Sequence, residues 1–478
     1  MDVPEILNRI FKYVDEHKSS LIEQLSEIVQ IRSVSGWEKT RAQTCDMVYE
    51  MANKFRLKGY QVFLRDVGVQ HMSNGKQIPL PPILLAQLGN DDKKKTICFY
   101  NYLDVQSALL EDGWNTDPFT LVERDGKLYG RGTSDNKAAV LCCINAVEGY
   151  LALGVELPVN IKFLFEAMQE SGSPNLSKLI EFEKDKFLSD VDYVCVCGGY
   201  WPEKEHPCII HGLKGYMYFY VEVKCASRDL HSGTFGGCIY EGMSDLIYLL
   251  NTLVDKEGII LIPDVNKNVA ATTLEELTRY AKTNFNLEDF KKRIGAKRLP
   301  HSDDKVQFLT RWWNLPSLSI HGIEGCYNEQ GEKMVIPGKV TGKFSVRLVP
   351  NQTTDEIKKL VLAHLNEKWK LRDSPNQIKI TVASDGSPWL SDPSHPHYSA
   401  AQRAYKYVYK KNADFIYESG SITPVSWLQE ILKKNIIILP ITSLDCSAHA
   451  QDEFIEVVKY LQGVKLIAAY FYEVSLMS

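Results

Sequence analysis

Residues 98–106 are the first stretch of the chain whose residue types could do chemistry. They read Cys-Phe-Tyr-Asn-Tyr-Leu-Asp-Val-Gln, so an apolar run typical of a buried strand ends near Tyr102, and Asp104 follows where the chain turns. A carboxylate at such a turn can hold a neighbouring side chain or bind a metal ion. The phenol of Tyr102, with an ordinary pKa of about 10, is a poor metal ligand unless a metal lowers that pKa.

Two cysteines offer further donors. Cys197 ends another apolar run, and Cys446 stands three residues before His449. Thiolates bind zinc well, but successive side chains of a strand alternate, so Cys197 and residue 198 would point to opposite faces. The chain has 11 cysteines, an odd number, scattered through apolar stretches. This usage favours buried, reduced thiols and predicts a cytoplasmic protein without a disulfide framework.

The composition excludes several classes of function. The 478 residues carry 55 Lys and Arg against 60 Asp and Glu, a net charge of −5, and no run of basic residues. We therefore expect no nucleic-acid partner and no binding to anionic membranes. No apolar stretch approaches about 18 residues, so no membrane span is expected, and the charged N-terminal segment does not read as a signal peptide.

The order of apolar patterns predicts an α/β protein with an insertion. Short apolar runs alternate with helical segments up to about residue 210, which is typical of an α/β sheet. The character then changes, because half-exposed strand patterns at 214–225, 339–349 and 377–383 alternate with helical patterns at 242–253 and 354–370. We expect a main domain of residues 1–209 plus 386–478 and an inserted α+β domain of residues 210–385.

Motifs along nearly the whole chain resemble one family, the carnosinase-like cytosolic non-specific dipeptidases. The order and number of these motifs make a chance likeness very unlikely. They include Gly113-Trp114 with Asp117-Pro-Phe, residues 123–132 with Ser134, Asp135 and Lys137, Glu170-Ser-Gly-Ser, Asp229-Leu-His231-Ser-Gly, His321-Gly-Ile-Glu-Gly, residues 344–351, and Ala448-His449 with Gln451 and Glu453. The resemblance implies a mixed-sheet metallo-exopeptidase domain with an inserted lid domain that forms a homodimer.

The resemblance also implies a degenerate metal site. In the family, two zinc or manganese ions share one carboxylate, which Asp135 matches. Glu170 and His449 match the second ion's own ligands. The first ion's histidine falls on Tyr102 and its aspartate on Gly198, and the general base falls on Gln169. Asp104, which orients the missing histidine in the family, would be left to bond the backbone or the phenol.

Further residues take family roles through their motifs. His231 matches a lid histidine that reaches the partner subunit's site, and Arg347 matches the arginine that clamps the substrate carboxylate. Residues 418–423 resemble a Glu-Gly-Gly-Ser-Ile-Pro loop that contributes Ser421, but serine stands at 419 and threonine at 423. Met334 replaces a substrate-facing threonine. An unusual peptide bond is expected between Asp135 and Asn136.

These matches predict a protein that binds a dipeptide-like ligand with at most one divalent ion, and whose hydrolysis is lost or strongly impaired. Glutamine cannot accept a proton from a bound water at neutral pH, and losing a general base costs about 10²–10⁴-fold. The alternative is an active zinc or manganese dipeptidase with a rearranged two-metal site. A third reading is a scaffold whose pocket has no role.

Overall fold

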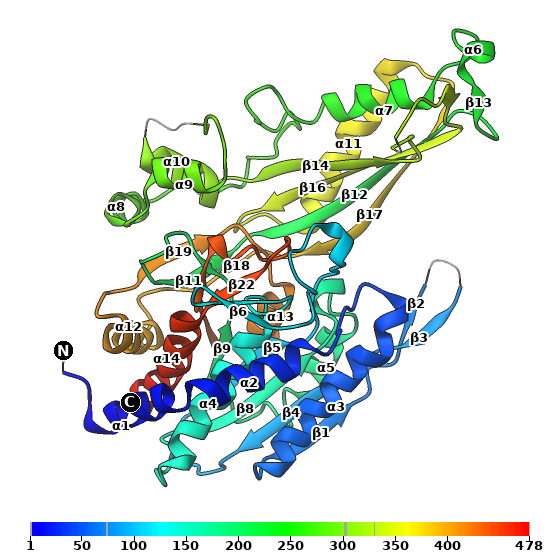
Figure 1. Ribbon diagram of the computed structural model, residues 1–478. Helices are drawn as coiled ribbons and strands as arrows, with labels where there is room; N and C mark the ends of the chain where they lie inside the picture. Colours follow the sequence, from blue (N-terminus) through cyan, green and yellow to red (C-terminus); the bar gives the residue numbers. More distant parts are fainter. Residues whose placement is uncertain (1, 73–74, 301–303, 329, 478) are drawn as a thin grey trace.

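The computed structural model describes residues 2–72, 75–300, 304–328 and 330–477 (Figure 1). Its larger sheet is mixed, because β8, β5, β9 and β20 run parallel while strands at both ends run antiparallel. The predicted α/β class with a mixed sheet is therefore confirmed. In spatial order the strands are β1 (Gln61–Arg65), β4 (Ile83–Leu88), β8 (Asn160–Glu166), β5 (Thr96–Tyr102), β9 (Tyr193–Cys197), β20 (Asn435–Leu439), β11 (Cys208–Leu213) and β18 (Trp389–Leu390), with β19 (Asp414–Glu418) also paired to β11.

Helices bury the larger sheet. The central strands β5 and β8 are buried along their whole length, which explains their nearly continuous apolar sequence. Helix α4 (Lys137–Ala152) is buried on almost every side and packs against α14 (Val457–Ser475). The other helices of this part are α1 (Glu5–Glu16), α2 (Lys18–Val29), α3 (Arg41–Leu57), α5 (Leu176–Glu183), α12 (Pro396–Tyr409) and α13 (Thr423–Leu432).

A second, smaller sheet stands above the first (Figure 1). It is antiparallel, in the order β14 (Ser317–Glu324), β16 (Lys339–Leu348), β12 (Gly215–Lys224) and β17 (Gln377–Gly386), and α7 (Gly242–Asn251) and α11 (Thr354–Arg372) contribute to its core. Alternate residues of β12, such as Phe219 and Val221, are buried against these helices. The strand and helix patterns predicted from residue 214 onward are thus confirmed, while the exact domain bounds stay a prediction.

Three helices between α7 and β14 return to the larger domain. They are α8 (Leu274–Lys282), α9 (Leu287–Arg293) and α10 (Lys305–Asn314). Tyr280, Phe285 and Trp313 belong to the same hydrophobic core as the larger sheet.

Among the described helices, none is long and apolar enough to cross a membrane. The remaining elements are short: α6 (Ser232–Phe235), β2 (Val69–His71), β3 (Gln77–Pro79), β6 (Val122–Arg124), β7 (Lys127–Tyr129), β10 (Tyr200–Trp201), β13 (Leu230–His231), β15 (Val335–Ile336), β21 (Thr442–Ser443), β22 (Phe454–Glu456) and the single turns η1 (Glu38–Thr40), η2 (Leu110–Asp112), η3 (Gln169–Ser171) and η4 (Leu444–Cys446).

Candidate metal centre

The candidate site lies where parallel strands of the larger sheet end together. Tyr102 is the last residue of β5, Glu170 lies on the turn η3 just after β8, and Gly198 directly follows β9. Because these strands are parallel neighbours, their carboxyl ends meet at one edge of the sheet. Asp135 precedes α4, and His449 comes from the loop before β22.

A buried glutamate holds the loop that carries Asp135. Glu453 is fully buried and accepts hydrogen bonds from the backbone nitrogens of Gly132, Ser134 and Asp135, at 2.8–3.0 Å. Its Oε2 also accepts from Nη1 of Arg131 at 2.6 Å. The peptide bond between Asp135 and the next residue, Asn136, is cis, so the unusual bond predicted there is confirmed.

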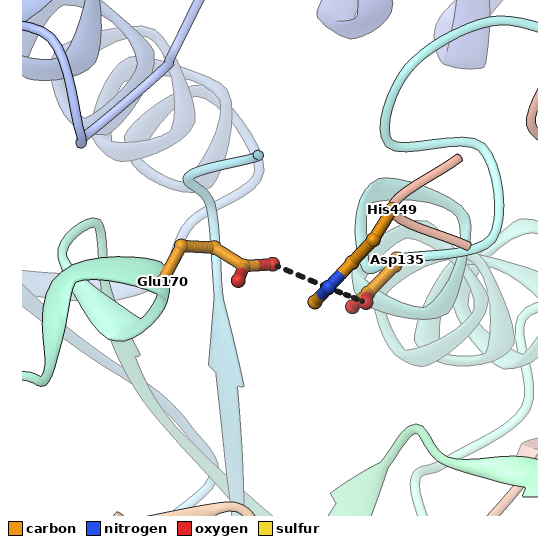
Figure 2. A group of neighbouring side chains, drawn as sticks. All are labelled: Asp135, Glu170 and His449. Atoms are coloured by element: carbon orange, nitrogen blue, oxygen red, sulfur yellow. Dashed lines mark ion pairs between the residues drawn. The ribbon is translucent and has the colours of Figure 1, made fainter. Parts of the chain in front are cut away.

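Three side chains converge as a possible ligand set. His449 Nε2 lies 3.0 Å from Asp135 Oδ2 and 3.4 Å from Glu170 Oε1 (Figure 2). One donor atom from each residue lies within 4.8 Å of the others. Tetrahedral zinc with bonds of about 2.0 Å places its ligands about 3.3 Å apart, so the three atoms suit one divalent ion after small adjustments. The structure thus brings together Asp135, Glu170 and His449, as the sequence predicted.

Charge in this cluster is balanced by the histidine. Hydrogen bonds to Asp135 and Glu170, against the effect of burial, raise the pKa of His449 to about 10. Burial opposes ionisation of Asp135, but hydrogen bonds led by that of His449 outweigh it and hold the pKa below its ordinary value. Burial raises the pKa of Glu170. A protonated imidazole therefore supplies, between two carboxyl groups, the positive charge that an ion would otherwise bring.

Two phenols also bond the carboxylate of Asp135, one at Oδ1 and one at Oδ2, the oxygen that His449 contacts. Tyr102 donates its hydroxyl to Asp135 Oδ1 at 2.5 Å, and Tyr200 donates to Oδ2 at 2.8 Å. Burial, followed by the charges of Asp135 and Glu170, raises the pKa of Tyr102 well above its ordinary value, so this phenol stays a neutral donor. Gly198 has no side chain to offer. These residues do not fit a second ion, which would need anionic or imidazole ligands at these positions.

The side chain of Asp104 accepts hydrogen bonds from the backbone. Its two carboxyl oxygens accept from the backbone nitrogens of Gln169 and Glu170, at 3.1 and 3.0 Å. One of the two roles predicted for it, bonding to backbone, is thus confirmed. The aspartate fixes the turn that presents Glu170. The Gln169 side chain lies in the pocket wall, where its amide cannot take up a proton.

A pocket of about 560 Å³ opens over the candidate site, between the two sheets. On its far wall, Arg347 of β16 donates from Nη1 to Ser421 Oγ at 2.9 Å. The predicted residues Arg347 and Ser421 thus lie opposite the acidic cluster. The main lining residues are Tyr102, Gln106, Asp135, Gln169, Glu170, Tyr200, Tyr216, Tyr218, His321, Arg347, Glu418, Ser421 and His449.

Two predicted residues lie elsewhere in this chain. His231, in β13, and Met334, just before β15, belong to paired segments at the far end of the smaller domain (Figure 1). Both side chains are exposed, Met334 by 61 %, and neither lines the pocket as the described residues form it. The role predicted for His231 requires a second copy of the chain and stays a prediction.

Sequence reasoning missed the pocket residues Tyr200 and Gln106, and it included Glu418 only as the first residue of the 418–423 loop. Tyr200 follows a strand end by three residues, Gln106 donates from Nε2 to Glu170 Oε2 at 2.8 Å, and Glu418 ends β19. Their positions after strand ends of an α/β sheet could have identified them. Burial, then the charge of Asp135, raises the pKa of Glu418 to about 8. Cys197 and Cys446, in contrast, are buried and free, as predicted.

The comparisons with known proteins agree along the whole chain. Residues 98–473 match peptidase family M20/M25/M40. A Beta-Ala-His dipeptidase of Rattus norvegicus is 43 % identical over 471 residues, which cover 98 % of this chain and 96 % of the relative. A Cys-Gly metallodipeptidase of Schizosaccharomyces pombe is 39 % identical over 473 residues, 99 % of each chain. The crystal structure of human carnosine dipeptidase 1 superposes with a TM-score of 0.95 at 41 % identity and covers 100 % of both chains. The resemblance read from the motifs is confirmed, and the chain belongs to peptidase family M20/M25/M40.

Proposed function

We propose that this chain binds dipeptide-like ligands and hydrolyses them very slowly or not at all. One observation carries the proposal: the phenol of Tyr102 donates a hydrogen bond to Asp135 Oδ1 and stands where a second ion would need an imidazole or anionic ligand. Gln169 removes the general base as well, at a cost of about 10²–10⁴-fold. The two losses act on one catalytic unit, so their costs are not simply additive.

A single zinc or manganese ion is compatible with the site. Asp135, Glu170 and His449 would hold it, and His449 would have to release its proton first. When bound, such an ion supplies positive charge that polarises a ligand carbonyl. The rest of the site orients the ligand without acting as a base, because the amide of Gln169 only exchanges hydrogen bonds.

The ligand proposed here is a small peptide with a free carboxylate. The relatives are named for Beta-Ala-His and Cys-Gly dipeptides, and a pocket of about 560 Å³ suits a molecule of that size. Arg347 offers a charged fork for the carboxylate, and Ser421 accepts a hydrogen bond from Arg347 and so helps to orient that fork. Met334, in place of a hydroxyl-bearing residue of the family pattern, points to a specificity that differs from that of the relatives.

The functional unit is proposed to be a cytoplasmic homodimer. The exposed position of His231 suits a residue that completes the partner's pocket rather than its own. Light scattering at micromolar concentration should therefore give twice the chain mass of 54.3 kDa. A monomer would remove the basis for a role of His231 in the site.

Hydrolysis of a simple dipeptide in excess manganese tests the proposed function. We expect turnover far below the ordinary enzyme range of about 1–10³ s⁻¹, together with measurable binding of the same dipeptide. Turnover within that range would establish the alternative, an active zinc or manganese dipeptidase with a rearranged site. Absence of both turnover and binding would leave only a scaffold role.

A further inference from the structure

The C-terminal end of helix α10 contacts the wall of the pocket. The last carbonyl groups of a helix have no partner within the helix and need donors from elsewhere. Ser419 Oγ donates to the carbonyl of Trp312 at 2.9 Å, and Lys214 Nζ donates to the carbonyl of Leu315 at 2.6 Å. Burial, followed by the charge of Arg347, lowers the pKa of Lys214 to about 7.

Lys214 and the loop that carries Ser419 also hold the hydroxyl that Arg347 contacts. Ser421 donates its one proton to the carbonyl of Lys214 at 2.5 Å, so towards Arg347 it can only accept. Arg347 donates to it from Nη1 at 2.9 Å. The backbone nitrogen of Lys214 donates to the carbonyl of Glu418, one residue before Ser419. The loop that carries Ser421 is thus attached at three points within four residues.

Lys214 also stands where the chain passes between the two sheets. It separates β11 of the larger sheet from β12 of the smaller one, and its side chain is 2 % exposed. Leu315, whose carbonyl accepts the hydrogen bond from Lys214 Nζ, lies just before β14, another crossing between the sheets. The hydrogen bond therefore connects two of the segments that pass between the sheets. Helix α10 itself packs into the core of the larger domain through Leu309 and Trp313.

We propose that Ser419 and Lys214 are positioning residues, which through Ser421 hold Arg347 ready for a ligand carboxylate. Neither needs to touch the ligand. In the loop pattern that residues 418–423 resemble, glycine stands at 419 and has no hydroxyl, so the bond to Trp312 is a feature of this chain. A preformed clamp lowers the ordering cost of binding and favours ligands with a free carboxylate. This inference rests on the proposed binding of dipeptide-like ligands.

The test compares a dipeptide with its C-terminal amide. Affinities of the full chain for alanylalanine and alanylalanine amide would be measured by calorimetry in wild type, Ser419→Ala, Ser419→Thr and Ser426→Ala. Ser419→Ala should weaken dipeptide binding by about 3- to 10-fold, the loss typical of one hydrogen bond, and leave amide binding unchanged. Ser419→Thr keeps the hydroxyl and should keep wild-type affinity.

Ser426→Ala is the matched control, because it removes a hydroxyl bond to the carbonyl of Thr423 at 2.8 Å, away from α10. It should change neither affinity. Lys214→Met should lower dipeptide affinity more than Ser419→Ala does, again without affecting the amide. Equal dipeptide affinity in wild type and Ser419→Ala, or an equal loss for both compounds, would overturn the positioning role. If wild type binds neither compound, the proposed function itself is wrong.

Discussion

The two sides of Asp135 differ in kind. On one side its carboxylate meets His449 and lies near Glu170, three groups that bind metal ions throughout protein chemistry. On the other side it meets the phenol of Tyr102, beside Gly198, which has no side chain. If the proposed function holds, the comparison teaches that one half of a two-metal site can be replaced while the other half keeps its ligands, because different loops carry the two halves.

Restoring the family residues at positions 102, 169 and 198 should give the largest effect, a rise in the rate of dipeptide hydrolysis. In Tyr102→His, Gln169→Glu, Gly198→Asp, a second ion gains ligands and the general base returns. A Cβ at Gly198 would lie 3.7 Å from Asn136 Nδ2, an ordinary contact, so the first atom of a side chain fits there. Dipeptide hydrolysis in excess manganese should rise by at least about 10²–10⁴-fold over wild type.

A double variant sharpens this prediction. Tyr102→His with Gly198→Asp, and Gln169 unchanged, should bind the second ion but gain little hydrolysis. If the triple variant folds, binds two ions and stays inert, the substrate end of the pocket has also changed. In that case the difference between the two sides of Asp135 would not be the main cause of inactivity.

The retained side should depend strongly on its buried support. Glu453→Gln removes the charge that pairs with Arg131, whose side chain is 2 % exposed, and weakens the bonds that hold the Asp135 loop. Leaving a buried charge unpaired costs about 3–5 kcal/mol of unfolding free energy. Urea denaturation measures this cost.

The control for that measurement is Glu16→Gln. Glu16 pairs with Lys12 at 3.7 Å, with side chains 59 % and 76 % exposed, and its loss should change stability by no more than about 0.5 kcal/mol. Similar small changes for both variants would mean that Glu453 does not support the loop in the way described.

The pH dependence of metal binding follows from His449. Its pKa in the metal-free protein is raised to about 10, so binding an ion must displace a proton at any pH below that value. Manganese affinity should therefore increase by up to about tenfold per pH unit between pH 6.5 and 8. A pH-independent affinity in wild type would show that His449 is not a ligand.

The apolar patterns predicted the fold because they are local signals, and the family motifs predicted that Asp135, Glu170 and His449 lie together. The apolar run of β5 follows from burial of both faces of that strand. The half-exposed alternation of β12 follows from burial of only one face. The backbone role of Asp104 was anticipated because no imidazole remained for it to orient. The return of α8–α10 to the larger domain left no such signal, because a helical pattern does not say against which sheet the helix packs.

The parts that could not be predicted depend on distant segments. The bond between Tyr102 and Asp135 joins a strand end to a loop 33 residues further on, and Tyr200 reaches the same carboxylate from a third segment. Such contacts depend on three-dimensional placement and not on residue spacing. The same holds for Ser419, which meets α10 more than a hundred residues earlier in the chain.

The number of divalent ions per chain tests the central claim most directly. After incubation with excess manganese and removal of free metal, mass spectrometry of the wild-type protein should find no more than one ion per chain, held by Asp135, Glu170 and His449. His449→Asn should then bring this number to zero. Two ions per wild-type chain would contradict the account, because the phenol of Tyr102 would then have to give up Asp135 Oδ1 to a second ion.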